Sequence, residues 1–99
     1  MAAIAREQIE EAIRNILVAE LELDPGTVGA YGAETPLLGR GIGLDSIDAL
    51  TLIAALEKRF DIEVDDEELT VQLFKSIRTL ADFIATKSEQ GTVAGESAR

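Results

Sequence analysis

Residues 46–60 read Ser-Ile-Asp-Ala-Leu-Thr-Leu-Ile-Ala-Ala-Leu-Glu-Lys-Arg-Phe, and this uninterrupted stretch decides the fold of the chain. It contains no glycine and no proline, and its apolar residues recur at helical spacing, which predicts an amphipathic helix. A rotation of about 100° per residue gathers one apolar side, which we expect to face a core: Ala49, Leu52, Ile53, Leu56 and Phe60. The opposite side presents Ile47, Thr51, Ala54 and Lys58.

The predicted helix begins at an Asp45-Ser46 pair that directly follows a glycine-broken loop. Either side-chain oxygen can cap the helix by accepting a hydrogen bond from a free backbone N–H, and Asp48 places a carboxylate at the positive end of the helix dipole. By residue preference alone, such a pair is most often a simple cap. The same geometry would expose the Ser46 hydroxyl beside backbone N–H groups that suit a phosphate, so Ser46 is a candidate for covalent modification.

Upstream, apolar residues at helical spacing predict a first amphipathic helix from about Ala5 to Leu21, which Asp24-Pro25-Gly26 ends. The connection from there to Asp45 is rich in glycine and contains both prolines. A long connection without regular structure is unusual in a compact domain and is often functional. Its scattered apolar residues indicate that it packs on the core: Val28, Tyr31, Leu37, Leu38, Ile42 and Leu44.

Downstream, a short helix is predicted after Val64, capped by Asp65 or Asp66 and using Leu69 and Leu73. Ser76 is expected to cap a final helix whose inward residues are Ile77, Leu80, Ala81 and Ile84. The tail, residues 88–99, has no periodicity and is predicted to be disordered. The sequence thus predicts an all-α domain over residues 1–87: a small four-helix bundle of three longer helices and one short helix, with a long loop between helices 1 and 2.

Composition limits the functions that the chain can have. Of its 99 residues, 19 are Asp or Glu and 9 are Lys or Arg, so the formal net charge is −10. This excess argues against binding nucleic acid and favours partner proteins with basic patches. The absence of cysteine and histidine removes any thiolate, the commonest general base and the commonest metal ligand. With no apolar run of transmembrane length and charge from Arg6 onward, we expect no membrane insertion and a cytoplasmic location.

Two other patterns suggest ligands only weakly. Six carboxylates within residues 61–68 make a weak divalent-ion site conceivable, with the candidates Asp61, Glu63, Asp65 and Asp66. An EF-hand turn needs glycine where Asp66 stands, so a solvated turn is the favoured interpretation and we predict no metal site. The glycine-rich residues 39–43 lack the preceding strand and the Lys-Ser/Thr of a nucleotide-binding loop. Their glycines are expected to bend the loop close to Ser46.

The run Gly43-Leu44-Asp45-Ser46-Ile47-Asp48 resembles the Asp-Ser-Leu or Asp-Ser-Ile core of the acyl carrier proteins and related peptidyl carriers. The likeness continues along the family's second helix and the turn after it, through Leu50, Leu52, Leu56, Glu57 and Phe60 to Ile62. In outline it covers the chain from the first helix to Ile84. Asp-Ser-Ile alone is a weak motif, but the helix and long loop upstream and the run Glu57-Lys58-Arg59-Phe60-Asp61-Ile62 downstream make the resemblance strong.

The resemblance implies that a phosphopantetheinyl transferase uses coenzyme A and magnesium to join 4′-phosphopantetheine to Ser46. The thiol of this arm would carry acyl groups as thioesters between acyl-loading and acyl-processing enzymes of a fatty-acid-like, polyketide or other specialised pathway. The protein would then be a monomeric carrier and a substrate of enzymes, and would not be an enzyme itself. A chain without a thiol of its own fits this role.

The resemblance also implies which residues meet partners and cargo. Partner enzymes with basic docking patches would contact the second helix and the loop before it, at Asp45, Ile47, Asp48, Thr51, Ala54 and Lys58. An acyl cargo would be sheltered by Leu50, Ile53, Leu56, Leu69 and Ile84. Thr51 and the pair Lys58-Arg59 stand where carriers of the fatty-acid type commonly have acidic residues, which favours a specialised pathway.

Two alternatives stay open at this point. The chain could be a peptidyl or aminoacyl carrier, which has the same modification and a different cargo. It could also be an unmodified helical interaction module with Ile47 and Thr51 on its docking surface, and then Ser46→Ala would leave its function intact. Catalysis is the least supported function, because the sequence offers no pairing of a nucleophile with a base.

Overall fold

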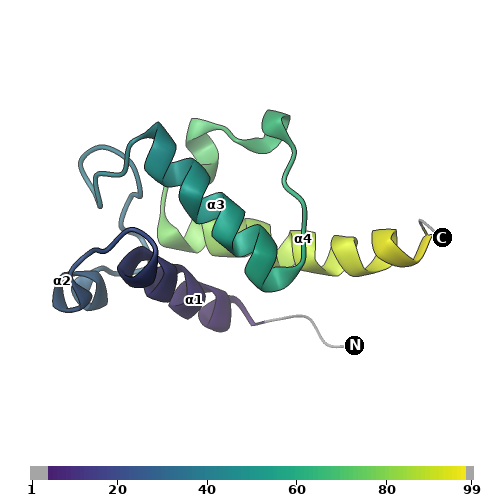
Figure 1. Cartoon of the computed structure of the whole chain (residues 1–99), viewed down its shortest axis with the longest axis horizontal. Coiled ribbons are helices and arrows are strands. Elements are labelled where there is room, and N and C mark those ends of the chain that lie inside the picture. The colour runs from purple at the N-terminus through teal and green to yellow at the C-terminus, as the bar shows by residue number, and fades with distance from the viewer. Residues whose placement is uncertain (1–4, 98–99) are drawn as a thin grey trace.

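The structure, a computed structural model, describes the backbone of residues 5–97 and the side chains of residues 5–88. The elements along the chain are α1 (Arg6–Ala19), α2 (Pro25–Ala30), α3 (Ser46–Phe60), the 3-10 helices η1 (Asp66–Glu68) and η2 (Val71–Phe74), and α4 (Ile77–Ser97) (Figure 1). Within residues 5–97 there is no β-strand, and the only β-type pairing is an isolated bridge between Leu38 and Leu44. The predicted all-α bundle of three longer helices and one short helix is confirmed.

The core forms where α1 packs against both α3 and α4. The predicted inward side of α3 is confirmed, since Ala49, Leu52, Ile53 and Leu56 are buried and Phe60 is half-buried. The long loop contributes Val28, Leu37 and Leu44 to the same core, as its apolar residues predicted. The rest of the buried apolar core is Ile9, Ala12, Ile13, Ile16, Leu17, Ile62, Leu73, Phe74, Ile77, Leu80, Ala81 and Ile84.

The short helix lies elsewhere than predicted. The short α-helix is α2, inside the stretch predicted to be irregular, because Asp24 caps it by accepting from the Thr27 N–H (2.9 Å) and Pro25 occupies its first turn. α1 already ends at Ala19, and Glu22 has a φ of +57°, so Asp24 and Pro25 start α2 and the prediction that they end the first helix is wrong. The helix predicted after Val64 is instead the pair of 3-10 turns η1 and η2, separated by extended backbone at Thr70. Short 3-10 turns let this connection bury Leu73 and Phe74 without a full α-helix.

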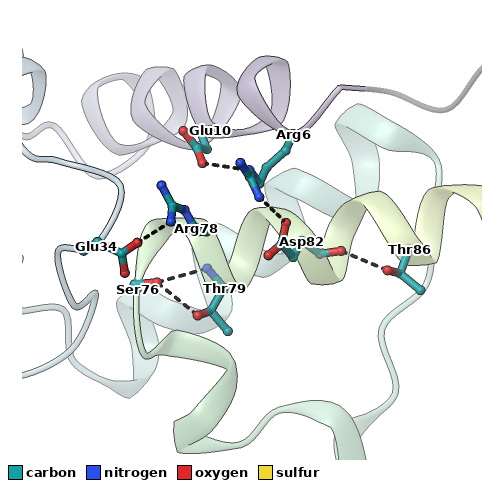
Figure 2. Close-up of polar contacts among 8 residues, drawn as sticks. All are labelled: Arg6, Glu10, Glu34, Ser76, Arg78, Thr79, Asp82 and Thr86. Carbon is teal, nitrogen blue, oxygen red and sulfur yellow. Dashed lines mark hydrogen bonds and ion pairs between the residues drawn. The ribbon is translucent and has the colours of Figure 1, made fainter.

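The last helix has the predicted start and a later end. Ser76 caps α4, because its Oγ accepts from the Thr79 N–H at 3.0 Å (Figure 2). The backbone of α4 stays helical through Ser97, although apolar periodicity ends near Ile84, and its final turns extend away from the other helices in Figure 1. These turns continue the hydrogen-bonded ladder that the packed part of α4 has already started, so they need no new helix nucleus. The predicted disorder of residues 88–99 stays a prediction, and residues 98–99 lie outside the described residues.

Polar contacts link the first and last helices. Arg6 of α1 lies between Glu10 on its own helix (3.5 Å) and Asp82 on α4 (3.4 Å), as Figure 2 shows. The Asp82 carboxylate is more than half exposed, so this contact contributes about 1 kcal/mol or less. It orients α1 against α4, and the stability of the bundle comes mainly from the apolar core.

One ion pair predicts a pH dependence of stability. Lys87 Nζ lies 2.9 Å from Glu68 Oε1, which also accepts from the Asp65 N–H at 2.9 Å. The hydrogen bond from Lys87, with that from Asp65, holds the pKa of Glu68 below its ordinary value of 4.5. Because the folded pKa is the lower one, this stabilisation is present above pH 4.5 and is lost as the pH falls through the folded pKa.

We therefore expect Lys87→Met to lower the free energy of unfolding at neutral pH by about 0.5 kcal/mol, a value that allows for the partial exposure of the pair. The difference from the wild type should shrink as the pH falls below 4.5. Urea unfolding followed by circular dichroism at a series of pH values measures it, with Lys75→Met as the exposed control. An equal loss at every pH would show that Lys87 stabilises the fold by packing alone.

Candidate functional site

Ser46 is the first residue of α3, and its side chain is exposed. The N-cap is Asp45, whose Oδ1 accepts from the Asp48 N–H at 2.8 Å, while Asp48 Oδ2 accepts the longer return bond from the Asp45 N–H at 3.5 Å. Of the two residues that the sequence left open as caps, Asp45 fills the role. Within the described residues, the Ser46 hydroxyl has no hydrogen-bond partner and is available for chemistry.

The electrostatics around Ser46 combine two opposite effects. The start of a 15-residue helix presents free backbone N–H groups at Ser46 and Ile47, which favour a phosphate oxygen. Asp45 and Asp48 add two carboxylates beside the hydroxyl, which make the surrounding surface negative. A basic surface on another protein therefore matches this end of α3.

Backbone hydrogen bonds hold the loop before α3 against the core. The Leu37 N–H donates to the Phe74 carbonyl (3.1 Å), and the Leu44 N–H donates to the Leu37 carbonyl (3.0 Å). Leu37 and Leu44 are both buried. This path joins η2, the loop and the residue two positions before Ser46, so the site rests on a folded loop.

A second set of contacts ties the earlier part of this loop to the start of α4. The Arg78 N–H donates to the Ala33 carbonyl (2.8 Å), and the Ile77 N–H donates to the Thr35 carbonyl (3.2 Å). The Arg78 guanidinium also pairs with Glu34 at 2.6 Å (Figure 2). These contacts explain how a connection with so little regular structure holds one shape.

The glycines bend the loop shortly before Ser46, as the sequence predicted. Gly39 and Gly43 have φ of +63° and +87°, a region that favours glycine. At Gly41 the constraint is close approach: the Ile42 N–H donates to the Pro36 carbonyl (2.8 Å), and a Cβ on Gly41 would lie 1.9 Å from that carbonyl oxygen. Only glycine fits at this position without moving the backbone.

Three large apolar side chains are exposed on α3 and η2. Ile47 and Leu50 follow Ser46 on α3 and are 73% and 53% exposed, and Val71 of η2 is 76% exposed. We call these three residues the exposed apolar surface. The rotation of about 100° per residue along the predicted helix places Ile47 opposite the core side, which predicted its exposure. Val71 is not among the predicted partner residues, and its only signal in the sequence is that it is an apolar residue between the polar residues Thr70 and Gln72.

The structure distributes the other predicted site residues between surface and core. Of the predicted partner residues, Asp45, Ala54 and Lys58 are exposed and Asp48 and Thr51 are half-buried. Of the predicted acyl-chain lining, the core cluster contains Ile53, Leu56 and Ile84, with Leu69 packed against it. Leu50 lies outside this cluster and is 53% exposed, so its contact with an acyl chain stays a prediction.

The weak divalent-ion candidates are not brought together. Within the described residues, no group of three or more acidic side chains is arranged to hold a metal ion, and this applies to Asp61, Glu63, Asp65 and Asp66. The carboxylates of this region act locally instead, with Glu68 held by Lys87. Among the helices of residues 5–97, none has the length and apolar character needed to cross a membrane.

The chain is similar to known proteins over a range that includes α3 and the loop before it. Residues 11–84 match the family described as the phosphopantetheine attachment site. The acyl carrier protein of Akkermansia muciniphila is 38% identical over 79 residues, which are 78% of this chain and 85% of that protein. The acyl carrier proteins of Bdellovibrio bacteriovorus and Thermosynechococcus vestitus are both 30% identical, over 82% and 83% of this chain and 96% and 94% of their own lengths.

Proposed function

This chain belongs to the acyl carrier protein family, and we propose that Ser46 is the residue to which its 4′-phosphopantetheine is joined. Its role is that of an acyl carrier rather than an enzyme, and its cofactor is phosphopantetheine. The observation that carries the assignment is the exposed Ser46 hydroxyl at the start of α3, without a hydrogen bond in the described structure. The cap belongs to Asp45, so modification of Ser46 disturbs no structural contact.

Peptide mapping tests the assignment. After incubation with a promiscuous phosphopantetheinyl transferase, coenzyme A and magnesium, the intact chain should gain the mass of one phosphopantetheine. Trypsin then releases residues 41–58, in which Ser46 and Thr51 are the only hydroxyl side chains. We expect fragment ions to place the group on Ser46, since the Thr51 hydroxyl already donates to the Ile47 carbonyl at 3.0 Å. A group on Thr51, or on another peptide, would contradict the assignment.

The exposed apolar surface, rimmed by Asp45 and Asp48, is the proposed docking site for the transferase and for acyl-processing enzymes. Exposed aliphatic side chains such as Ile47 can enter a partner's pocket, while the carboxylates steer a basic surface toward Ser46. Of the predicted partner residues, Ile47 belongs to this surface, and Asp45 and Asp48 form its rim. Thr51, Ala54 and Lys58 lie further along α3, outside this surface.

We expect Ile47→Glu to lower the kcat/KM of the transferase by about tenfold, because a buried interface contact is lost and a charge is desolvated. The fold should be unaffected, since Ile47 is 73% exposed. The matched control is Ala30→Glu, which places the same charge on the exposed end of α2. Equal rates for the two variants would remove Ile47 from the docking surface.

For the cargo, we propose that an acyl chain enters the bundle beside Leu50 and lies among Ile53, Leu56, Leu69 and Ile84. Leu50 follows Ser46 by one helical turn on the same side of α3, which suits an entrance better than a lining position. The aliphatic core with few aromatic residues can adapt to a linear chain. On loading hexanoyl-phosphopantetheine, the methyl NMR signals of these residues should shift. Unchanged signals would place the cargo outside the bundle.

The pathway that fits this chain best is a specialised one, such as the assembly of a polyketide or a modified lipid, in the cytoplasm. Thr51, Lys58 and Arg59 support it, because they replace negative charge with neutral or positive side chains along α3. A partner enzyme that recognises a uniformly acidic helix would meet two cations, Lys58 and Arg59, in the last turn of α3. An aminoacyl cargo is the alternative, and loading assays with acyl and aminoacyl donors separate the two.

A further inference from the structure

A groove of about 600 Å³ lies between the C-terminal half of α1 and the outer side of α3. Ser46 and the exposed apolar surface do not line it. Its apolar part is made by Ile16 and Ala19 of α1 and by Ala54 and Ala55 of α3. Three of these four are alanines, so the two helices leave a hollow that larger side chains would fill.

Two adjacent cations, Lys58 and Arg59, stand at the α3 side of this groove. Within the described residues, Lys58 has no ion pair or hydrogen bond, and Arg59 lies over the Phe60 ring, with Cζ 5.7 Å from the ring centroid. Most other described cations are engaged: Arg6, Arg78 and Lys87 in ion pairs and Arg14 with the Tyr31 carbonyl. The groove therefore holds free positive charge on a chain of net charge −10.

The position of these cations has a partial structural explanation. Basic residues in the last turn of α3 interact favourably with the negative end of the helix dipole, by about 0.3–1 kcal/mol. The dipole does not explain why the neighbouring side chains are small enough to leave a hollow beside the charges. One acid, Glu20, also lines the groove, so the cations outnumber the acids there.

We propose that this groove docks an acidic segment of a partner protein. An apolar side chain of the segment would rest on Ile16 and the alanines, and carboxylates of the segment would pair with Lys58 and Arg59. Charge complementarity favours an acidic occupant, because Lys58 and Arg59 line the groove. The surface around Ser46 is negative and therefore attracts basic partners instead. The groove thus lets the carrier bind a second class of surface, and the proposal does not depend on the modification of Ser46.

The test uses the unmodified full chain and a helical peptide built from Glu and Leu as the probe. In ¹⁵N NMR titrations, we expect this peptide to shift the amide signals of Asn15, Ala19 and Ala55 in the groove. The same peptide with Lys in place of Glu should shift signals of the acidic surface instead. Shifts outside the groove with the Glu-Leu peptide, or groove shifts with both peptides, would overturn the proposal.

Charge variants sharpen the test. The double variant Lys58→Glu/Arg59→Glu should weaken binding of the Glu-Leu peptide by about tenfold, because attraction becomes repulsion. The control Arg40→Glu/Lys75→Glu makes the same change in net charge at exposed positions outside the groove and should leave binding nearly unchanged. Equal weakening by the two variants would show a response to overall charge alone, which contradicts a specific site.

Filling the hollow tests its shape separately from its charge. Ala19→Trp should reduce binding of the Glu-Leu peptide, whereas Ala30→Trp, an exposed alanine on α2, should not. The remaining possible occupant of the groove is a second copy of the chain. Light scattering of the chain alone tests it by measuring the oligomeric state. Dimerisation that Lys58→Glu/Arg59→Glu abolishes would assign the groove to self-association and would refute docking of a partner.

Discussion

Ser46→Ala is expected to abolish the gain of phosphopantetheine completely while changing the free energy of unfolding by no more than about 0.5 kcal/mol. The chemical loss should be complete, because alanine lacks the hydroxyl oxygen through which the proposed attachment would form. The fold is spared because Asp45 caps α3 and the Ser46 side chain is exposed without a hydrogen bond in the described structure. Intact mass after the transferase reaction and urea unfolding measure the two effects.

Asp45→Ala is the matched contrast at the neighbouring position. It removes the acceptor for the Asp48 N–H and should cost about 1 kcal/mol of stability, while the Ser46 hydroxyl stays in place for modification. If Ser46→Ala proves the more destabilising of the two, the assignment of the cap to Asp45 is wrong. If the folded wild type gains no mass with several transferases, an unmodified interaction module becomes the better explanation of the exposed apolar surface.

Gly41→Ala is expected to lower the free energy of unfolding by about 2–3 kcal/mol. The added Cβ would lie 1.9 Å from the Pro36 carbonyl oxygen, so the loop must open and the 2.8 Å hydrogen bond from the Ile42 N–H must lengthen or break. The atom in the way belongs to the backbone and cannot rotate aside as a side chain would. Urea unfolding of the variant measures the loss.

Gly32→Ala is the control, because its Cβ would meet nothing within 4 Å and its φ is not positive. Both substitutions stiffen the unfolded chain to a similar extent, so Gly32→Ala should be neutral or slightly stabilising. The loop opened by Gly41→Ala also leads directly to Ser46, and the transferase should therefore work more slowly on that variant. Similar stability for the two variants would show that the loop tolerates a rearrangement at Gly41.

The fold and the position of the proposed modification site were predictable to the extent that local rules govern them. α3 has the predicted bounds, 46–60, because its caps and its apolar spacing are all local. Ser76 caps α4 for the same reason. The location of the short helix was not predictable in this way, since Asp24-Pro25 was interpreted as the end of the first helix, whereas α1 ends at Ala19 and Asp24 caps α2. The break between η1 and η2 depends on the burial of Leu73 and Phe74, and no local sequence pattern predicts that burial.

The site shows the same division. Resemblance to a family was needed to choose Ser46 over a simple cap, and the structure adds that its hydroxyl is free. Leu50 was placed in the cargo lining by analogy, yet a helical rotation of α3 that buries Ile53 and Leu56 turns Leu50 outward. Val71 could not be recognised beforehand, because its exposure follows from how η2 sits on the core.

By itself, the sequence determined the three long helices, the caps at the starts of α3 and α4 and the exposed position of Ser46, because periodicity and capping act within a few residues. Only the tertiary structure decided the close approach of Gly41 to Pro36, the anchoring of the loop on Phe74 and Arg78, and the groove beside Lys58. These features join residues far apart in the chain. Their energies depend on how whole helices pack, which local preferences do not specify.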